Sequence, residues 1–169
     1  TGDNMTITEA DSNTRKVTSN AFKDGQYMPV DYTGFGKDMS PDFRLHNLSK
    51  KAVSIAIIMD DLDIPFLPAY NHWLIWNIPA MQEIPEKIPH GPEIPGLGNA
   101  RQGIAYGKNK YRGPKQPVFI RNMHRYVFRI YVLDCFLDLT AASVKKDLTE
   151  AMEGHVLQQG SIMGKYKRK

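Results

Sequence analysis

Acidic and histidine residues stand at the borders of the apolar segments of this chain. Asp60, Asp61 and Asp63 follow a β-branched run, and His72 and His124 each open another strand-like run. Because side chains alternate along a strand, Asp61 and Asp63 are expected on one side and Asp60 on the other. Histidine presents a charge or a hydrogen bond near neutral pH, so this set predicts one pocket. An anion beside these histidines would raise their pKa values by favouring the charged form.

Each of these residues also has a structural interpretation. Closely spaced acids before Pro65 are typical of a turn in which carboxylates cap backbone amides. A calcium loop would need more oxygen ligands and a glycine for its turn, so we expect no metal and no cofactor. A single histidine is more often structural than catalytic, and only the combination favours a site.

A glycine-proline pair follows Tyr111 and Arg112. Glycine at position 113 would let a backbone amide approach a ligand without a Cβ in the way, which is how loops offer N–H groups to a phosphate. Taken alone, Gly113-Pro114 is only a turn.

Short strand-like segments separated by turn residues recur along the chain, over residues 17–22, 43–48, 52–59, 73–78, 125–133 and 156–163. In 125–133, Tyr126 and Phe128 belong to one apolar face, and Val127 and Tyr131 to the other. A strand that is apolar on both faces belongs in the middle of a packed sheet. The pattern predicts a mostly β protein, a two-sheet antiparallel β-sandwich with one or two short helices.

One helix is expected near the C-terminus. Thr140 or Ser143 can cap its start, Val144, Leu148 and Met152 recur at four-residue spacing, and Gly154 ends it. Prolines and glycines are too frequent between residues 79 and 117 for regular structure. A loop of that length is uncommon unless it binds something or is disordered.

The length of 169 residues suits one domain, with residues 1–16 as a flexible arm and residues 17–169 as the folded part. Nucleic-acid binding is not expected, although the net charge is +4, because the basic excess gathers at the C-terminal end. No stretch is apolar enough for stable membrane insertion. Cys135, the only cysteine, follows an apolar strand pattern, which predicts a buried, inert thiol.

Taken together and in order, the motifs resemble the phosphatidylethanolamine-binding protein family, also called Raf kinase inhibitor-like proteins, and its compact bacterial branch in particular. The residues that carry the resemblance are Asp61-Leu62-Asp63-Ile64-Pro65, His72-Trp73 with Asn77-Ile78-Pro79, Tyr111-x-Gly113-Pro114, and His124-Arg125-Tyr126-x-Phe128. The likeness extends from Val17 to the C-terminal end.

The resemblance implies a β-sandwich with a small cavity that accepts phosphate or phosphoethanolamine-like headgroups. The residues expected to line it are Asp61, His72, Gly113, Pro114, His124 and Tyr126. Asp63 and Arg125 are expected to form an ion pair that braces the loops from behind. The implied function is non-enzymatic binding of a small anion with a regulatory or inhibitory role, in a cytoplasmic homodimer.

Two other functions stay open. The first is inhibition of a kinase or protease partner through the loops around the pocket. The second is weak phosphoester hydrolysis by the Asp/His pocket, although no Gly-x-Ser-x-Gly elbow supplies a nucleophile. Val118, Phe119 and Ile120 bear on the first: they either form an exposed apolar rim or fold into the sandwich as a strand.

Overall fold

The computed structural model describes residues 16–169 as two packed antiparallel sheets with one α-helix, which confirms the predicted β-sandwich. The predicted arm lies, except for Lys16, outside the described residues. The six-stranded sheet has the order β10-β9-β4-β5-β8-β7 and the three-stranded sheet the order β2-β3-β6. The bounds are β2 Val17–Thr18, β3 Phe43–Leu45, β4 Ser54–Asp61, β5 Tyr70–Pro79, β6 Glu83–Ile84, β7 Glu93–Ile94, β8 Ala100–Gln102, β9 Met123–Leu133, β10 Val156–Lys167, α1 Lys145–Met152, and 3-10 turns η1 Val30–Tyr32 and η2 Pro95–Leu97.

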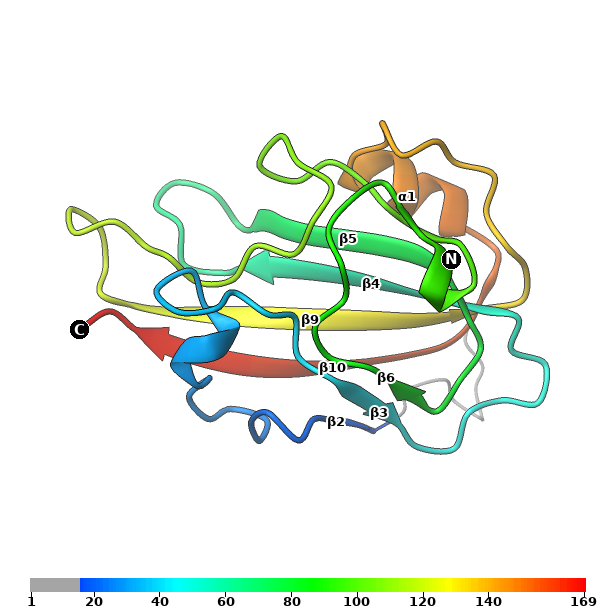
Figure 1. Cartoon of the computed structure of the whole chain (residues 1–169), viewed down its shortest axis with the longest axis horizontal. Helices are drawn as coiled ribbons and strands as arrows, with labels where there is room; N and C mark the ends of the chain where they lie inside the picture. Colours follow the sequence, from blue (N-terminus) through cyan, green and yellow to red (C-terminus); the bar gives the residue numbers. More distant parts are fainter. Residues whose placement is uncertain (1–15) are drawn as a thin grey trace.

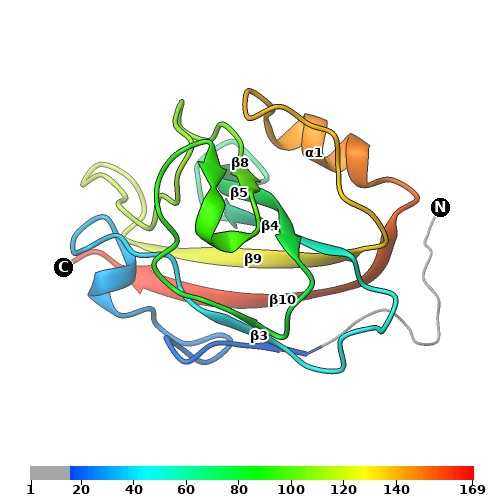
Figure 2. The ribbon, with the colours of Figure 1, turned by 45° about the vertical axis from the view of Figure 1, so that its right-hand side comes forward.

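The larger sheet is covered on both faces (Figures 1 and 2). The smaller sheet and its connections lie over one face, and α1 lies over the other. Alternating residues of the central strands therefore enter different cores: Ile57 and Phe128 pack between the sheets, whereas Ile58 and Leu133 pack toward α1. The predicted central place of the strand now called β9 is confirmed, since it pairs with β10 on one side and β4 on the other.

The helix begins later than its sequence suggested. Its N-cap is Val144, and the carboxylate of Asp147 accepts the Val144 N–H at 2.9 Å. Thr140 and Ser143 instead form a preceding turn, in which the Ser143 N–H donates to the Thr140 carbonyl. Leu148 and Met152 are buried as expected, but Val144 is exposed because it stands before the first helical turn.

The proline- and glycine-rich stretch is more regular than predicted. It contains β6, β7, η2 and β8, and β8 pairs with β5. Buried Gln102 on β8 anchors it: its Oε1 accepts the Trp73 Nε1–H at 2.7 Å, and its Nε2 donates to the carbonyls of Pro89 and Gly91. A network of polar side chains thus orders backbone that cannot form long strands.

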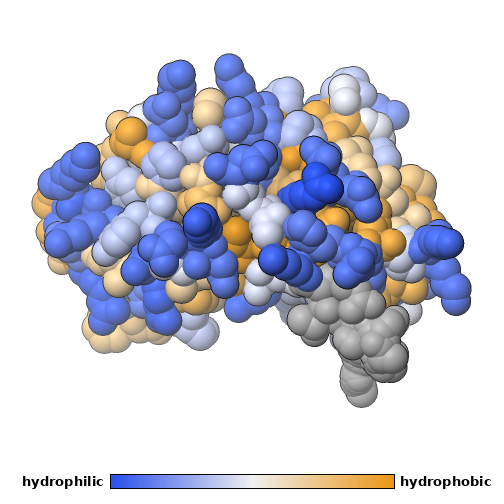
Figure 3. Space-filling view, turned by 90° about the horizontal axis from the view of Figure 1, so that it is seen from below, coloured by the Kyte–Doolittle hydropathy of each residue, from blue (hydrophilic) through white to orange (hydrophobic). Residues whose placement is uncertain are grey.

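The face seen from below mixes hydrophilic side chains with hydrophobic areas (Figure 3). In residues 16–169, no helix is long and apolar enough to cross a membrane.

Candidate anion-binding site

Two strand ends and a third strand bring an aspartate and two histidines together. Asp61 is the last residue of β4 and lies opposite Tyr126 of β9 and Tyr70 of β5. His124 is the second residue of β9, two residues before Tyr126 and therefore on the same face. The His124 Nδ1–H donates to Asp61 Oδ2 at 2.6 Å, and His72 Nε2 lies 4.0 Å from the same oxygen. The predicted grouping of these four residues is what the fold produces.

The cluster is enclosed by protein, with Asp61, His72, His124 and Tyr126 all buried. His124 Nε2 is buried and has no hydrogen-bond partner in the part of the chain that the structure describes. The other ring nitrogen is held by Asp61, so protonation of His124 would place a free N–H donor inside the cluster. This atom is the one unsatisfied polar group of the four clustered residues.

The pKa of His72 is lowered, which corrects the expectation of a raised value. Burial disfavours the charged ring and outweighs two opposing effects, the hydrogen bond to the Arg112 carbonyl and the charge of Asp61. His72 Nδ1 donates to that carbonyl at 2.8 Å, which leaves Nε2 as an acceptor in the neutral ring. Tyr106 OH approaches Nε2 at 3.4 Å.

Two tyrosines that the sequence analysis missed cover His72 on its solvent side. Tyr106 and Tyr70 are partly exposed and contact each other and the His72 ring edge to face. The Arg112 guanidinium lies 4.0 Å from the centre of the Tyr106 ring, a cation–π contact. Tyr106 stands inside the proline- and glycine-rich stretch. The one signal that pointed toward it was that a loop of this length is uncommon unless it binds something or is disordered.

The amide of Gly113 is not free for a ligand, contrary to expectation. Its N–H donates to Asp38 Oδ1 at 2.8 Å, and the neighbouring Pro114 carbonyl accepts the Gly34 N–H. A Cβ at position 113 would lie 2.3 Å from the Tyr32 carbonyl oxygen and 2.7 Å from Asp38 Oδ1. Glycine is therefore required here by the close approach of the segment 32–38.

Tyr126 packs against both histidines of the cluster. Its ring packs edge to face on His72 and stacks on His124, while its OH donates to Gln116 Oε1 at 3.2 Å. Burial, followed by the charge of Asp61, raises the pKa of Tyr126 far above its ordinary range. The hydroxyl therefore stays neutral and acts as a hydrogen-bond donor.

Asp63 and Arg125 form the expected brace. Arg125 Nε and Nη2 donate to the two carboxylate oxygens at 2.9 and 3.0 Å, and the Arg125 backbone N–H adds a third bond. These bonds lower the pKa of Asp63. Since Arg121 also reaches Asp63, the β4–β5 loop and the segment before β9 are tied together beside the cluster.

The apolar residues before β9 form an exposed rim, and the alternative of a buried strand is wrong. Val118 and Phe119 are 79% and 83% exposed, and they lie in a turn between Pro117 and Ile120. Phe66 and Leu67 are exposed in the neighbouring β4–β5 loop. We call these four residues the apolar rim.

Cys135 is partly exposed, which corrects the expectation of a buried thiol, because β9 ends at Leu133 and the apolar pattern does not continue as strand. Burial and the neighbouring Asp134 raise its pKa, so the thiol is a poor nucleophile. It stands at the opposite end of β9 from His124 and takes no part in the cluster.

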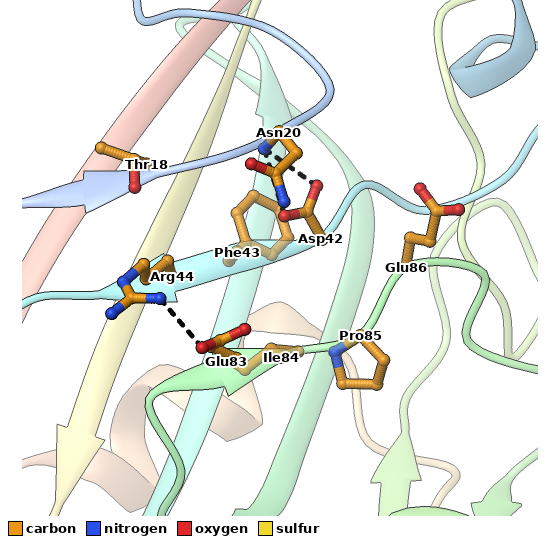
Figure 4. Close-up of a pocket in the computed structure, with 9 residues that line it drawn as sticks. All are labelled: Thr18, Asn20, Asp42, Phe43, Arg44, Glu83, Ile84, Pro85 and Glu86. Atoms are coloured by element: carbon orange, nitrogen blue, oxygen red, sulfur yellow. Dashed lines mark hydrogen bonds and ion pairs between the residues drawn. The ribbon is translucent and has the colours of Figure 1, made fainter.

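A surface hollow of about 560 Å³ lies elsewhere, on the smaller sheet (Figure 4). Its charged side chains already have partners: Arg44 bonds to Glu83, and Asp42 accepts the Asn20 backbone N–H. Because no buried polar group points into it, we do not assign it a ligand.

These features define a class of protein: a two-sheet β-sandwich with a buried Asp/His cluster where β4 and β9 meet. Residues 18–167 match the family model described as phosphatidylethanolamine-binding protein. The chain belongs to the phosphatidylethanolamine-binding protein family.

The relatives are bacterial and archaeal. A UPF0098 protein of Pyrococcus abyssi is 40% identical over 152 residues, which cover 89% of this chain and 84% of the relative. A UPF0098 protein of Aquifex aeolicus is 36% identical over 156 residues, covering 90% and 88%.

Solved structures agree with this fold. The crystal structure of a phosphatidylethanolamine-binding protein homologue from Chlamydia trachomatis matches with a TM-score of 0.80 and 29% identity, covering 94% of this chain and 100% of the other. The structure of YbcL from E. coli matches with a TM-score of 0.80 at 22% identity, covering 92% and 99%, and supports the fold alone.

Proposed function

We propose that the chain is a non-enzymatic binding protein whose Asp61, His72, His124 and Tyr126 cluster accepts a small phosphate-type anion. The observation that carries this proposal is the buried Nε2 of His124, which has no partner within residues 16–169 while Nδ1 is fixed on Asp61. A buried polar atom without a partner is costly, and a protonated Nε2 would donate its N–H to a ligand oxygen.

The positive charge for such a ligand comes from the histidines. With a proton on both nitrogens, the His124 ring carries one positive charge and donates to Asp61 and to the anion, and the Asp61 carboxylate stabilises that charge. His72 contributes when it is protonated, because Nδ1 stays on the Arg112 carbonyl and Nε2 becomes a donor. Access requires movement of Tyr106, which now approaches that nitrogen.

Binding should therefore strengthen as the pH falls through the histidine range. The lowered pKa of His72 places its protonation below the unperturbed value of about 6.5. Sulfate, which stays a dianion over this range, separates protonation of the protein from protonation of phosphate.

The test is calorimetric titration of phosphate, sulfate and phosphoethanolamine into the wild type, His72→Ala and His124→Ala. We expect each variant to bind at least about tenfold more weakly, or about 1.4 kcal/mol, while retaining its fold by circular dichroism. His155→Ala, at a half-exposed histidine beside the opposite end of β9 from His124, is the matched control. Unchanged affinity in both cluster variants would contradict the proposal.

Hydrolysis is an alternative outcome of the same experiment. Steady release of phosphate from a phosphate ester by the wild type, lost in His124→Ala, would favour an enzyme over a binding protein. The poor nucleophilicity of Cys135 and its distance along β9 argue for binding.

A second candidate function, contact with another protein through the apolar rim, is favoured by the exposure of Val118 and Phe119. We propose that these residues meet either a second copy of the chain or a partner whose kinase or protease activity they inhibit. Solution mass over a range of concentrations tests the first form. A dimer that Phe119→Ser dissociates would support it, and a strict monomer would exclude it.

A further inference from the structure

A mixed group of metal-binding side chains lies at the far end of β9 from the His124 cluster. Asp134 and Cys135 follow β9, and His155 immediately precedes β10. One carboxylate oxygen, the Cys135 Sγ and one His155 ring nitrogen all lie within 4.8 Å of one another. Since β9 has eleven residues, the group lies roughly 30 Å from His124.

Three hydrogen bonds hold the backbone around this group in place. The Asp134 N–H donates to the His155 carbonyl at 3.0 Å, and the His155 N–H donates to the Met152 carbonyl at the end of α1. Ser54 Oγ donates to the Cys135 carbonyl at 2.6 Å. The three side chains thus start from fixed positions and converge without any rearrangement of the chain.

Accessibility distinguishes this group from a buried structural cluster. The side chains of His155 and Asp134 are 45% and 44% exposed, and Cys135 is partly exposed. The His155 Nδ1 to Asp134 Oδ1 distance of 2.9 Å makes an ion pair of the kind that contributes little at a surface. Such a pair explains two of the residues and leaves the thiol beside them without a role.

The donor set has a preferred ion. A carboxylate oxygen, a thiolate and an imidazole nitrogen are the three ligand types that zinc accepts, and a fourth position can be filled by water. Ligand atoms around one zinc ion are about 3.3–3.8 Å apart, given bonds of about 2.0–2.3 Å. The 4.8 Å spread closes to that range by rotation of exposed side chains.

We propose that Asp134, Cys135 and His155 bind one zinc ion and thereby fasten the α1-bearing segment between β9 and β10 to the end of the sheet. Binding forms a zinc–sulfur bond and releases the thiol proton to solvent. Asp134 and Cys135 are adjacent, but His155 stands 21 positions after Asp134, which is why their grouping gives no recognisable motif. The proposal is independent of anion binding at the Asp61 cluster.

Cobalt titration of the metal-free full chain tests the ligand set directly. Because Cys135 is the only cysteine, any thiolate-to-cobalt charge-transfer absorption reports on that residue alone. We expect the band to saturate at one cobalt per chain and to disappear when zinc is added. Cys135→Ser should abolish it, and His155→Ala and Asp134→Asn should each weaken cobalt binding at least about tenfold. His90→Ala should leave it unchanged.

Thermal unfolding with and without zinc provides the second readout. An ion that binds only the folded state raises the unfolding midpoint, so the same zinc concentration should stabilise the wild type and His90→Ala more than any of the three ligand variants. The proposal is overturned by the absence of a band, by a band whose affinity is the same in His155→Ala and Asp134→Asn, or by saturation at half an equivalent. The last result would mean that two chains share the ion.

Discussion

Asp60 and Asp61 are neighbouring buried carboxylates on β4 that face opposite sides of the sheet, and their partners differ in kind. Asp60 pairs with Arg129 at 3.1 Å and with Lys145 at 2.7 Å, both permanent cations. Asp61 lies beside His124 and His72, whose charge depends on pH. A carboxylate with permanent cations is suited to holding α1 on the sheet, whereas one with histidines can respond to a proton or a ligand.

The largest expected effect is on stability, when the Asp60 carboxylate is replaced by an amide. Asp60→Asn should lower the free energy of unfolding by about 2–3 kcal/mol, because bonds to charged groups are lost. Arg129 and Lys145 are 41% and 39% exposed and can hydrate, which keeps the cost below that of a fully buried pair. Urea unfolding measures it. Anion affinity should stay within about twofold, and a large loss would place Asp60 in the site.

The pKa of His72 should respond differently to the loss of Asp61 and to the loss of Asp60. The charge of Asp61 opposes the effect of burial on this ring, and the charge of Asp60 does so less. Asp61→Asn should therefore lower the pKa of His72 further, and by more than Asp60→Asn does. Titration of the His72 ring signals in the absence of anions measures both shifts. Equal shifts would show that the two carboxylates act alike on the histidine.

The same ring gives a stability effect whose sign follows from its lowered pKa. As the pH falls below about 6.5, the unfolded chain takes up this proton before the folded chain does. His72 should therefore make the wild type less stable with falling pH in that window, and a saturating anion should offset the loss. Urea unfolding at a series of pH values, with and without sulfate, checks this. A loss that sulfate leaves untouched would separate His72 from the anion.

The smallest expected effect on stability is that of Arg125. Like Asp60, Asp63 pairs with a permanent cation, but here the cation is at the surface. Arg125 is 47% exposed, so Arg125→Gln should cost about 1 kcal/mol at neutral pH. The pKa of Asp63 is lowered in the fold, so this contribution is present above the unfolded value near 3.9 and lost as the pH falls through the folded one. Denaturant midpoints should differ at neutral pH and converge in acid. A difference that persists in acid would mean that packing dominates.

Local pattern was sufficient to predict the long central strands and the grouping of the cluster, although β6, β7 and β8 were not expected. Alternation of apolar residues located β9 and its two buried faces, and the antiparallel pairing of β4 with β9 then brings Asp61 beside His124. The opposite sides to which Asp60 and Asp61 point follow from the period of two, whereas Asp63 lies beyond the end of β4. These features depend on neighbours along the chain, and a sequence displays such neighbours directly.

Other features depend on contacts that a sequence does not display. The Gly113 amide is occupied by Asp38, which is 75 positions away, and the pKa of His72 depends on how completely the fold buries it. Tyr106 covers the site from a stretch whose order comes from the buried Gln102 network. Local propensity could not show any of these contacts.

Histidine ring signals followed during a sulfate titration give the most direct test of the Asp61 cluster as an anion site. The spectra would be recorded with a chelator present, about one unit on either side of the unperturbed pKa of about 6.5. The account predicts that sulfate shifts the ring signals of His72 and His124, and shifts them more at the lower pH. The His72 signal is identified by its absence from the spectrum of His72→Ala. The signals of His46, His90 and His155 should not move. Unshifted cluster signals at saturating sulfate, or equal shifts of all five histidines, would contradict it.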